Sequence, residues 1–408
     1  MNACLIAYTF YEFDFRVRRY AEALAKRGNR IDVIVLRRKG EKPHGVLKGV
    51  NIFRIQRRSS NEKGVLSYVL GVGLFFIRGT LTLLAMHLRR RYQVIHIHNV
   101  PDFLVFMGVI PKLMGARIIL DIHDILPEFF CQKFNHGMDT ALAKLLLIIE
   151  KISVHFADHV ISANDIWREK IINRDQIPSK ACTTIINYPQ QVSMQKSPRA
   201  PDKRPFTIIY PGTVSHHHGL DIAIKAISIA KKEIPSLRLD LFARSNNLKY
   251  YNSLRDLIKN LGLEKNVRFF PTVPIDRLLP ICQRANIGIV PKREGIFASE
   301  ALSSKIFDYM AAGLPVIAAK TKIAEYYFPD SMIMFFEPEN PQDLARCIVE
   351  LSKNPEKGQS LSDNGKQFVA HNNWEAKKQI YLDLVDSLAT RPYRPTTKFF
   401  GSDPQDNR

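Results

Sequence analysis

Short runs of apolar residues alternate along this chain with longer stretches in which apolar residues recur every three or four positions. The short runs have the length and the Val and Ile content of buried strands. In the first half of the chain they predict strands at 3–8, 31–36, 51–55, 94–98, 117–121, 159–163 and 183–186. Helical patterns fill the gaps and are clearest at 16–27 and 138–156. This alternation predicts an α/β fold with a parallel sheet covered on both faces.

A polar, proline-rich segment then divides the chain. Residues 187–205 contain four prolines and few apolar residues, which predicts an interdomain linker over 191–205. The alternation begins again at residue 206, with strands predicted at 237–242, 267–270, 287–290, 315–318 and 332–335. We therefore expect two Rossmann-like, doubly wound domains, 1–190 and 206–373, that face an interdomain cleft.

The end of the chain follows a different pattern. A last helix is predicted over 374–390 and is expected to cross back to the first domain, whereas the Pro-rich, polar tail 391–408 is expected to be disordered. In open α/β sheets, ligands bind beyond the carboxyl ends of the strands. The residues that follow each predicted strand are therefore the first candidates for a site.

Composition adds the expected setting. The 408 residues, 46% hydrophobic and 24% charged, are typical of a soluble globular protein of about two domains. Five cysteines form no CxxC pair, and the N-terminus lacks the basic start of a signal peptide. Both features predict a reducing, cytoplasmic location.

The positive charge is concentrated near the N-terminus. The formal net charge is +20, and residues 1–91 hold 19 Lys and Arg against 6 Asp and Glu, which is +13. Such an excess fits an anionic membrane surface, a phosphorylated acceptor or nucleic acid, or simply a solubilising surface.

One apolar stretch, 65–86, is long enough to span a bilayer. Arg78 lies inside it, and a span would separate the strands before and after it, which belong to one predicted sheet. We therefore favour a buried or interfacial helix, anchored by the three arginines at 89–91 and peripheral at the inner leaflet of the cytoplasmic membrane.

The stretch SEALSSKIFDYMAAGLPVIAA, 299–319, combines two acids with a helix start. The helix is predicted to begin near the N-cap residue Ser304 and to end at Gly313. Helix N-termini bind anions, so the backbone at 302–305, with Ser303 and Lys305, forms a candidate diphosphate cradle.

The two acids offer acceptors for hydroxyl groups. Glu300 fits the hydroxyls of a sugar, and Asp308 fits the vicinal hydroxyls of a ribose. The alternative is structural: Lys305 and Asp308 form a surface pair three residues apart on a well-capped helix.

Histidines and an acid follow the central strands of the first domain. His123 and Asp124 come after strand 117–121, and a neutral imidazole there can donate to a sugar hydroxyl or to a leaving phosphate. His98 and Asn99 end the previous strand and are candidates for an acceptor pocket, and Arg16 is a candidate to reach the cleft. The structural alternative for His123 is a satisfied histidine at a strand end.

The loop after the first strand of the second domain, PGTVSHHHG, contains Gly212 and Thr213, which would let the backbone approach a diphosphate closely. His218 or Arg244 would add cations there. A zinc site built from the three consecutive histidines at 216–218 is disfavoured, because adjacent residues rarely converge on one ion.

The sequence gives little support for a metal or a redox cofactor. His96, His98, His123 and Asp124 suggest a metal only weakly, since ligand spacing on a single element is missing and His96 is expected to pack inward. No D-x-D triplet, G-x-G-x-x-G fingerprint or Walker A pattern occurs. We therefore expect no metal and no cofactor.

Taken together, E-x7-D followed by YMAAGLPVIA resembles the E-x7-E donor signature of glycosyltransferase family 4, the retaining enzymes with the GT-B fold. FDFRVRRYAEALAKRGNRIDVIVL, YQVIHIHNVPDFL, ARIILDIHDILPE and FTIIYPGTVSHHHGLDIAIKAI are similar to further segments of that family, and ALSSKIFDYMAAG to its branch that builds bacterial surface polysaccharides. The second acid is Asp308 where the family usually has Glu, and LSSK replaces a Gly-rich piece.

This resemblance implies a metal-independent hexosyltransferase that takes a sugar from a nucleotide-diphosphate sugar. It implies catalytic roles for His123, Asp124 and Glu300. Donor contacts are implied for Gly212, Thr213, His218, Arg244, Ser303, Ser304, Lys305 and Asp308. The acceptor would be a saccharide or a lipid-linked saccharide, with no nucleic acid involved.

Two other functions remain open from the sequence. A nucleotide-sugar 2-epimerase shares a GT-B-like fold and would convert the donor without an acceptor. A non-enzymatic binder of membrane or nucleic acid would depend on the basic segment and on salt, and would be indifferent to Asp308.

Overall fold

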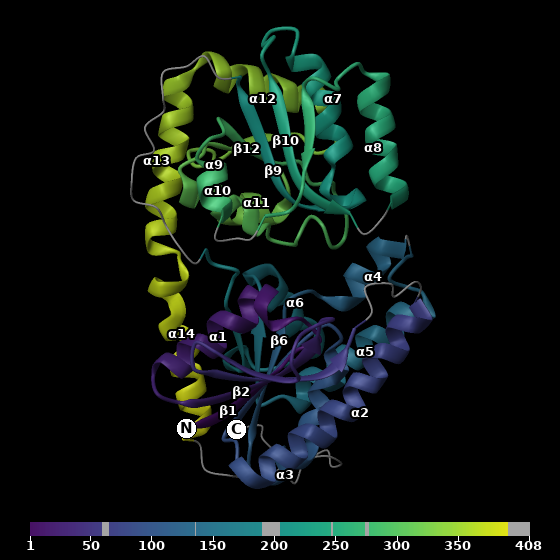
Figure 1. The fold of residues 1–408 in the computed structure, drawn as a ribbon, viewed down its shortest axis with the longest axis vertical. Coiled ribbons are helices and arrows are strands. Elements are labelled where there is room, and N and C mark those ends of the chain that lie inside the picture. The colour runs from purple at the N-terminus through teal and green to yellow at the C-terminus, as the bar shows by residue number, and fades with distance from the viewer. Residues whose placement is uncertain (59–64, 135, 190–204, 246–247, 274–276, 391–408) are drawn as a thin grey trace, which may run out of the picture.

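A computed structural model describes residues 1–58, 65–134, 136–189, 205–245, 248–273 and 277–390, with only the backbone described at 65, 66, 244 and 245. The predicted linker, up to residue 204, and the predicted tail 391–408 lie outside the described residues. The described chain forms two α/β domains, one above the other in Figure 1, each built on its own sheet.

The sheet of the first domain has the strand order β3-β4-β2-β1-β5-β6-β7-β8. All neighbours pair in parallel except β3, which pairs antiparallel with β4 at the edge. The strands are β1 (Asn2–Ile6), β2 (Arg30–Arg37), β3 (His44–Leu47), β4 (Val50–Arg57), β5 (Val94–His98), β6 (Arg117–Ile122), β7 (His159–Ser162) and β8 (Cys182–Thr184).

The sheet of the second domain is fully parallel, in the order β11-β10-β9-β12-β13-β14. Its strands are β9 (Thr207–Val214), β10 (Arg238–Ser245), β11 (Val267–Phe270), β12 (Ile287–Val290), β13 (Val316–Ala319) and β14 (Met334–Phe336). Parallel strands need crossover connections, and helices provide them in both domains.

The helices of the first domain are α1 (Phe15–Lys26), α2 (Val65–Arg90), α3 (Val109–Leu113), α4 (Leu126–Phe134), α5 (Ala141–Phe156) and α6 (Asp165–Asp175). Those that follow are α7 (Leu220–Ala230), α8 (Leu248–Asn260), α9 (Leu278–Cys282), α10 (Ser304–Ala312), α11 (Lys322–Tyr327), α12 (Pro341–Lys353), α13 (Pro355–His371) and α14 (Trp374–Ala389). Short 3-10 turns are η1 (Tyr11–Phe13), η2 (Asp102–Gly108), η3 (Ser179–Ala181) and η4 (His216–His218).

The predicted alternation of strands and helices is confirmed. Strands 94–98, 267–270 and 287–290 have the predicted bounds, and the other predicted strands differ by a few residues at their ends. The antiparallel edge strand β3 was not predicted, because its sequence HGVL is short and has a Gly. Both domains are doubly wound, as expected from the apolar runs.

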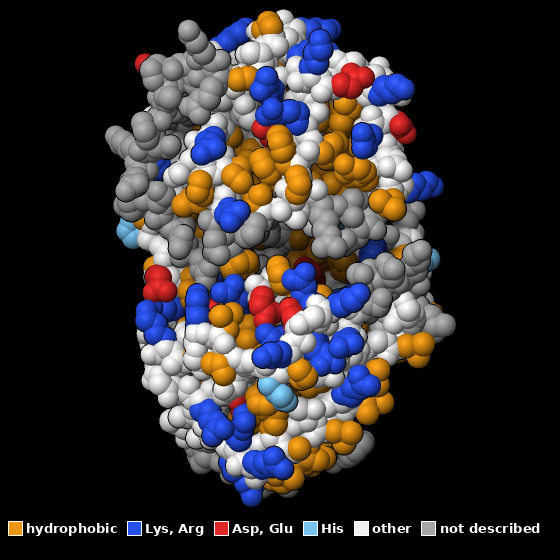
Figure 2. Space-filling model, in the orientation of Figure 1, with side chains coloured by type: hydrophobic (Ala, Val, Ile, Leu, Met, Phe, Trp, Pro, Cys, Tyr) orange, Lys and Arg blue, Asp and Glu red, His pale blue; other side chains and the backbone are white. Residues whose placement is uncertain are grey.

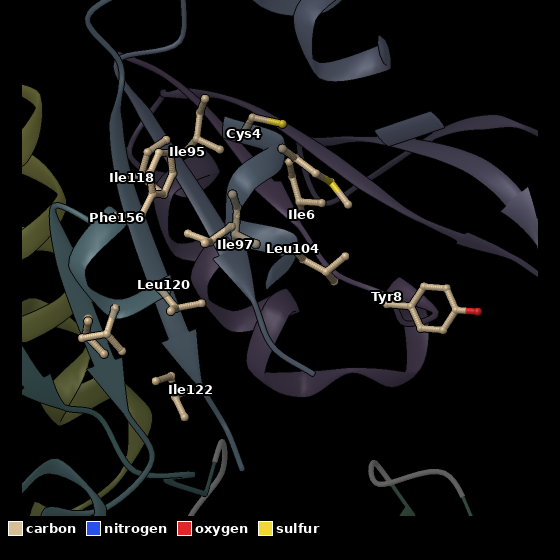
Figure 3. Close-up of a cluster of buried hydrophobic side chains, with 14 of the residues drawn as sticks. Cys4, Ile6, Tyr8, Ile95, Ile97, Leu104, Ile118, Leu120, Ile122 and Phe156 are labelled. Carbon is tan, nitrogen blue, oxygen red and sulfur yellow. The ribbon is translucent and has the colours of Figure 1, made fainter. Parts of the chain in front are cut away.

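Both faces of the first sheet are covered. Figure 3 shows side chains from three neighbouring strands gathered on one face: Cys4 and Ile6 of β1, Ile95 and Ile97 of β5, and Ile118, Leu120 and Ile122 of β6. Helices α2, α5 and α6 pack on this face together with η2. The alternate residues, such as Ala3 and Leu5, face α1 and α14 on the other side.

The last two helices run along one side of both domains (Figure 1). Helix α13 packs on the second domain, where it contacts α10, and α14 packs on the first domain. The rings of Tyr381 in α14 and Tyr20 in α1 have centroids 4.2 Å apart, with Trp374 beside them. The chain therefore returns to its first domain after completing the second.

Candidate active site between the domains

The loops after β6 and β12 and the 3-10 turn after β9 meet between the two domains, at the carboxyl ends of the strands. They enclose a cavity of about 250 Å³, and Figure 2 shows the surface hollowed between the domains. The lining residues are Asp124 and Phe129 of the first domain and His217, His218, Lys292, Phe297, Ala301, Leu302, Ser303, Ser304 and Lys305 of the second.

A larger cavity, about 760 Å³, lies at the opposite end of the second sheet. Its lining includes Phe206, Arg238, Asn286 and Pro315, which stand at the start of strands β9, β10, β12 and β13. Ligands of open α/β sheets bind at the carboxyl ends instead. The smaller interdomain cavity is therefore the better candidate for an active site.

Helix α10 points its N-terminus into this cavity. Its N-cap is Ser303, one residue before the predicted Ser304, and the Ser303 side chain makes no capping hydrogen bond to the helix. Both serines and Lys305 line the cavity, as the predicted cradle required. Gly313 ends the helix at φ 71°, which confirms the predicted C-terminus.

Gly212 lies inside β9 and not in the loop predicted after it, and it lets the end of this strand approach Lys305 closely. The glycine has φ 153°, and a Cβ there would lie 2.4 Å from the Lys305 Cε. The Lys305 ammonium lies over the Tyr210 ring, 5.1 Å from its centroid. Burial lowers the pKa of Lys305 to about 8, against the opposing attraction of Asp308.

Lys292, which was not predicted as a site residue from the sequence, supplies a second cation. Its side chain is 8% exposed, and its ammonium donates to the carbonyls of Ala298 at 2.8 Å and Ala301 at 2.6 Å. Burial and the charge of Lys305 lower the pKa of Lys292 to about 7, and Asp124 opposes the shift. Its place directly beyond β12 is the sequence signal that could have identified it.

His218 differs from its predicted role as a cation. Its Nδ1 donates to the carbonyl of Thr213 at 2.8 Å, and burial together with Lys305 lowers the pKa of His218 to about 2. His217 is held near a pKa of about 4 by burial and by Lys292. Both imidazoles are neutral near pH 7, so the positive charge of the cavity comes from the two lysines.

Thr213 therefore contributes through its backbone carbonyl in this arrangement. Arg244 is paired through its backbone with Thr213 in neighbouring strands, but its side chain lies outside what the structure describes. The predicted contact of the Arg244 side chain with a diphosphate stays a prediction.

Asp308 lies one turn into α10 and is half-buried, as is Lys305. The alternative of an exposed surface pair is thus not what the structure shows. Burial raises the pKa of Asp308 to about 6, and the positive charge of Lys305 partly offsets that shift. The carboxylate is costly to keep ionised without hydrogen-bond donors, which vicinal hydroxyls would provide.

Glu300 lies in the contact between the domains and is not among the residues that line the cavity. Lys170 of α6 and Lys322 of α11 each bind one of its carboxylate oxygens, and Asn164 donates to its backbone carbonyl at 3.0 Å. Burial opposes ionisation, but the two lysines hold the pKa of Glu300 below its usual value. The prediction of a free carboxylate facing a sugar differs from this arrangement.

The loop that contains Glu300 is fixed to the first domain. Gln132 of α4 accepts hydrogen bonds from the backbone of Phe297 at 2.9 Å and of Ala298 at 2.7 Å. The Phe297 ring packs against Trp167 and Phe129 with centroids 5.5 and 5.1 Å away. These contacts join the loop to α4 and α6 of the first domain beside the cavity.

On the side of the first domain, His123 belongs to a buried polar cluster. Its Nε2 lies 3.2 Å from the carboxylate of Asp121 and 3.0 Å from the Nδ1 of His98. The His123 side chain is 20% exposed. Asp124, the next residue, lines the cavity, and burial raises its pKa while His123 and Lys292 oppose the shift.

Three acceptor-side predictions need correction. Arg16 is 5% exposed and donates three hydrogen bonds to Asp121, at 3.2, 2.9 and 2.8 Å, so it does not reach the cleft. His98 is 1% exposed and contacts the His123 ring from the buried side instead of lining an open pocket. Asn99 is also buried, and its amide accepts from the His123 backbone and donates to the Asp124 carbonyl.

These three residues are better described as supports for His123 and Asp124. His96 packs inward, as predicted, with its Nδ1 3.0 Å from the Tyr381 hydroxyl. The potential ligand atoms of His96, His98 and Asp121 lie within 4.8 Å of one another. Arg16 already neutralises Asp121, however, and its fixed positive charge would repel a metal ion at that place.

Two family models match the chain. "Glycosyl transferase 4-like domain" matches residues 15–187, and "Glycosyl transferases group 1" matches residues 193–368. The first match covers most of the first sheet and the second covers the second sheet. The cavity therefore lies at the junction of the two matched regions.

Individual proteins agree with these matches. An uncharacterized glycosyltransferase of Methanocaldococcus jannaschii is 23% identical over 319 residues, 72% of this chain and 87% of that protein. Sucrose-phosphate synthase of Thermosynechococcus elongatus has a TM-score of 0.74 at 19% identity, over 95% of this chain and 99% of its own. Anabaena HepE, solved with UDP-glucose, has a TM-score of 0.69 at 15% identity, over 95% and 100%. These similarities confirm the GT-B fold.

Proposed function

We propose that this chain, which matches a glycosyl transferase 4-like domain followed by a group 1 domain, moves a hexose from a nucleotide-diphosphate sugar to a saccharide or lipid-linked saccharide. The second domain binds the donor, and the first domain binds the acceptor. The product belongs to a polysaccharide or another cell-envelope glycan, and the anomeric configuration of the sugar is retained.

One observation carries this proposal: Lys292 and Lys305 flank the N-terminus of α10 inside a cavity that opens toward Asp124 of the first domain. The buried Lys292 and the half-buried Lys305 both have lowered pKa values and repel each other, and an anionic diphosphate relieves that repulsion. Free N–H groups at the helix start add hydrogen bonds to the same anion.

The donor is oriented by the groups around this anion site. The diphosphate lies against the start of α10 and the end of β9 at Gly212, and Asp308 accepts from the ribose hydroxyls. HepE is solved with UDP and with UDP-glucose, which supports testing uridine donors first. The base and the sugar of this chain's own donor follow from that test.

Catalysis rests on positioning and on charge. As the bond between sugar and diphosphate breaks, negative charge grows on the leaving phosphate, where Lys305 and the helix N-terminus stabilise it. His123 donates from Nδ1 to the leaving phosphate or to a sugar hydroxyl, while its Nε2 accepts from the Nδ1 of His98. No step requires a metal ion.

Asp124 and Glu300 are the acids nearest to the sugar in this proposal. Asp124 faces Lys292 across the cavity and accepts from a sugar hydroxyl. Glu300 does so only after it exchanges Lys170 and Lys322 for the sugar, which makes its role conditional on a movement of the loop.

The proposed setting is the cytoplasmic side of a membrane, where the enzyme is peripheral. The +13 charge of residues 1–91 supports attraction to anionic lipids. A lipid-linked acceptor would then be presented at the same surface.

The test is sugar transfer with the full chain. Radiolabelled UDP-glucose and other nucleotide sugars are incubated with membrane lipid fractions that contain saccharide acceptors, and the products are separated and their anomers assigned by NMR. Lys305→Met should lower transfer by at least about tenfold. Lys225→Met, an exposed lysine on α7, is the matched control and should retain activity.

The same incubation without acceptor separates the epimerase alternative. An epimerase converts the nucleotide sugar into its epimer under these conditions, whereas a transferase leaves it intact or slowly hydrolyses it. Epimer formation in the absence of acceptor would replace the proposed function.

A further inference from the structure

Helix α2 is apolar on both of its sides. On the inner side, Val72, Phe75 and Leu83 are buried against the first sheet. On the outer side, where a globular protein usually places polar residues, the exposed fractions are 64% for Leu70, 42% for Leu74, 58% for Ile77, 64% for Leu81 and 54% for Leu88. Their spacing of three, four and seven residues forms one continuous stripe.

Helices α5 and α3 show the same pattern. In α5, Leu142, Leu145, Ile148 and Ile152 are between 46% and 55% exposed. In α3, Val109, Ile110 and Leu113 are between 38% and 65% exposed. Exposed single apolar residues are ordinary, but stripes on three neighbouring helices are not. We call these exposed residues of α2, α3 and α5 the apolar shelf.

The three helices present their outer sides in the same direction. All of them pack around η2, which lies on the face of the sheet covered by α2 and α5. Their outward sides therefore point away from that face together. Figures 1 and 2 show the helices along one edge of the lower domain, with hydrophobic side chains gathered there.

The charges on the shelf have one sign. Arg78 and Arg89 of α2 and Lys144 and Lys151 of α5 are exposed beside the stripes. The only acid in the three helices is Glu150, which is fully buried and paired with Arg174. Apolar side chains with basic neighbours are typical of a helix that lies in the interface of an anionic bilayer.

We propose that the apolar shelf inserts into the headgroup region of an anionic membrane, so that α2 and α5 lie in the membrane plane. The role of this membrane contact, which is to bring a lipid-linked acceptor to the cavity, rests on the proposed function. Helix α4 packs against α5 and places Phe129 in the cavity lining, so it joins the shelf to the site.

Two other occupants fit less well. Residues Ser67–Arg90 are long and apolar enough to cross a membrane, with mean hydropathy 1.9, but the strands before and after α2 belong to one sheet, and its inner side is committed to the core. A second copy of the chain would bring two basic surfaces together, which like charges oppose.

The experiment is sedimentation of the full protein with phosphatidylcholine vesicles, with and without phosphatidylglycerol. We expect binding to the anionic vesicles, and a loss of at least about tenfold in the double variant Ile77→Glu, Leu81→Glu and in Ile148→Glu, Ile152→Glu. Leu248→Glu is the matched control, because Leu248 of α8 in the second domain is 73% exposed and should be neutral.

Depth is measured with Leu81→Trp. The two native tryptophans, Trp167 and Trp374, are 2% and 4% exposed, so the new indole reports on the shelf alone. Quenching by shallowly brominated lipids supports insertion. Quenching only by deeply brominated lipids, or no binding of the wild type to anionic vesicles, would overturn the proposal.

Dimerisation, misfolding and donor binding are tested separately. If light scattering shows a dimer that Ile77→Glu, Leu81→Glu separates, the shelf binds a second copy and the lipid proposal is wrong. Thermal unfolding shows whether each variant is folded, and a misfolded pair is replaced by Arg78→Gln, Lys144→Gln, which should weaken anionic binding alone. Donor binding, measured by calorimetry, should be unchanged in all shelf variants, so failure of the donor site and failure of the shelf are separate results.

Discussion

At the scale of single residues, the site is defined by ionisable groups whose charged forms are destabilised by burial in the absence of a ligand. Lys292, with a pKa of about 7, is buried, and its neighbour Lys305, with a pKa of about 8, is half-buried. Asp308, with a pKa of about 6, is also half-buried. A nucleotide sugar offers an anion to the lysines and hydroxyl donors to the acid. Each group would then move toward its charged form.

Proton linkage follows from these shifts. At about pH 8, binding of UDP-glucose or the preferred nucleotide sugar should take up protons, because the diphosphate raises the pKa of Lys292 and Lys305. At about pH 6, binding should release protons, because Asp308 must ionise to accept from the ribose.

Calorimetry in two buffers of different ionisation enthalpy measures both effects. Lys305→Met should reduce the uptake at the higher pH, and Asp308→Asn should abolish the release at the lower pH. A proton count that does not change with pH, or that Asp308→Asn leaves unaltered, would contradict the assignment of these two groups.

The raised pKa of Asp308 predicts that this residue lowers the stability of the unliganded protein while it favours donor binding. Its pKa in the folded state, about 6, is above its ordinary value of 3.8, so the folded protein binds more protons than the unfolded chain between these values. Stability is therefore lost as pH rises through this window, and the loss is complete above it.

Asp308→Asn should accordingly stabilise the unliganded protein at neutral pH, by about 1–2 kcal/mol after allowance for solvent screening, and have little effect near pH 4. The same variant should bind the donor more weakly. Thermal unfolding at both pH values checks the first part, and a variant less stable than the wild type at neutral pH would show that Asp308 has a favourable partner in the free protein.

At the scale of elements, the loop between β12 and α10 connects the two domains to the site. Within this loop, Lys292 donates to the carbonyls of Ala298 and Ala301. Gln132 of the first domain accepts from the backbone of Ala298. Glu300 closes the contact through Lys170 and Lys322. The Glu300 carboxylate therefore fixes this loop to α6 of the first domain and to α11 of the second.

Removing the two lysine contacts of Glu300 tests whether this carboxylate binds the donor sugar. If Glu300 contacts the donor sugar after exchange, Lys170→Met with Lys322→Met should strengthen binding of the nucleotide sugar by a few-fold. Binding of the nucleoside diphosphate alone should not change, because it lacks the sugar.

The two affinities are measured by calorimetry on the same protein samples, with Lys225→Met as the control. The double variant should be less stable by about 3 kcal/mol, because it leaves the largely buried Glu300 carboxylate without a cationic partner. Equal changes in both affinities would mean that Glu300 acts on the diphosphate or on the domain contact, and not on the sugar.

The elements also show what the sequence could predict. Continuous apolar runs located the buried strands, and Ser303, Ser304 and Gly313 marked α10 to within one residue. Partners distant in sequence were not predictable: Lys170 is 130 positions from Glu300, and Arg16 is 105 positions from Asp121. A pattern of neighbours along the chain contains no information about such pairs.

At the scale of the whole molecule, two sheets face each other with the site between their carboxyl edges (Figure 1). Helix α14 returns to the first domain and packs Trp374 and Tyr381 into its core, so the chain crosses between the domains at two places. The fold was predictable because it follows from the alternation of strands and helices along the chain and from their apolar patterns. The outward face of α5 was not, because exposure depends on tertiary packing.

The binding of nucleotide sugars tests the central claim most directly. UDP-, GDP-, ADP- and dTDP-sugars are titrated into the wild type, Lys305→Met and the control Lys225→Met. We predict that one nucleotide series binds, that Lys305→Met weakens it by at least about tenfold, and that the control binds as the wild type does. If no series binds, or if Lys305→Met binds equally well, the start of α10 is not the diphosphate site and the account is wrong at its centre.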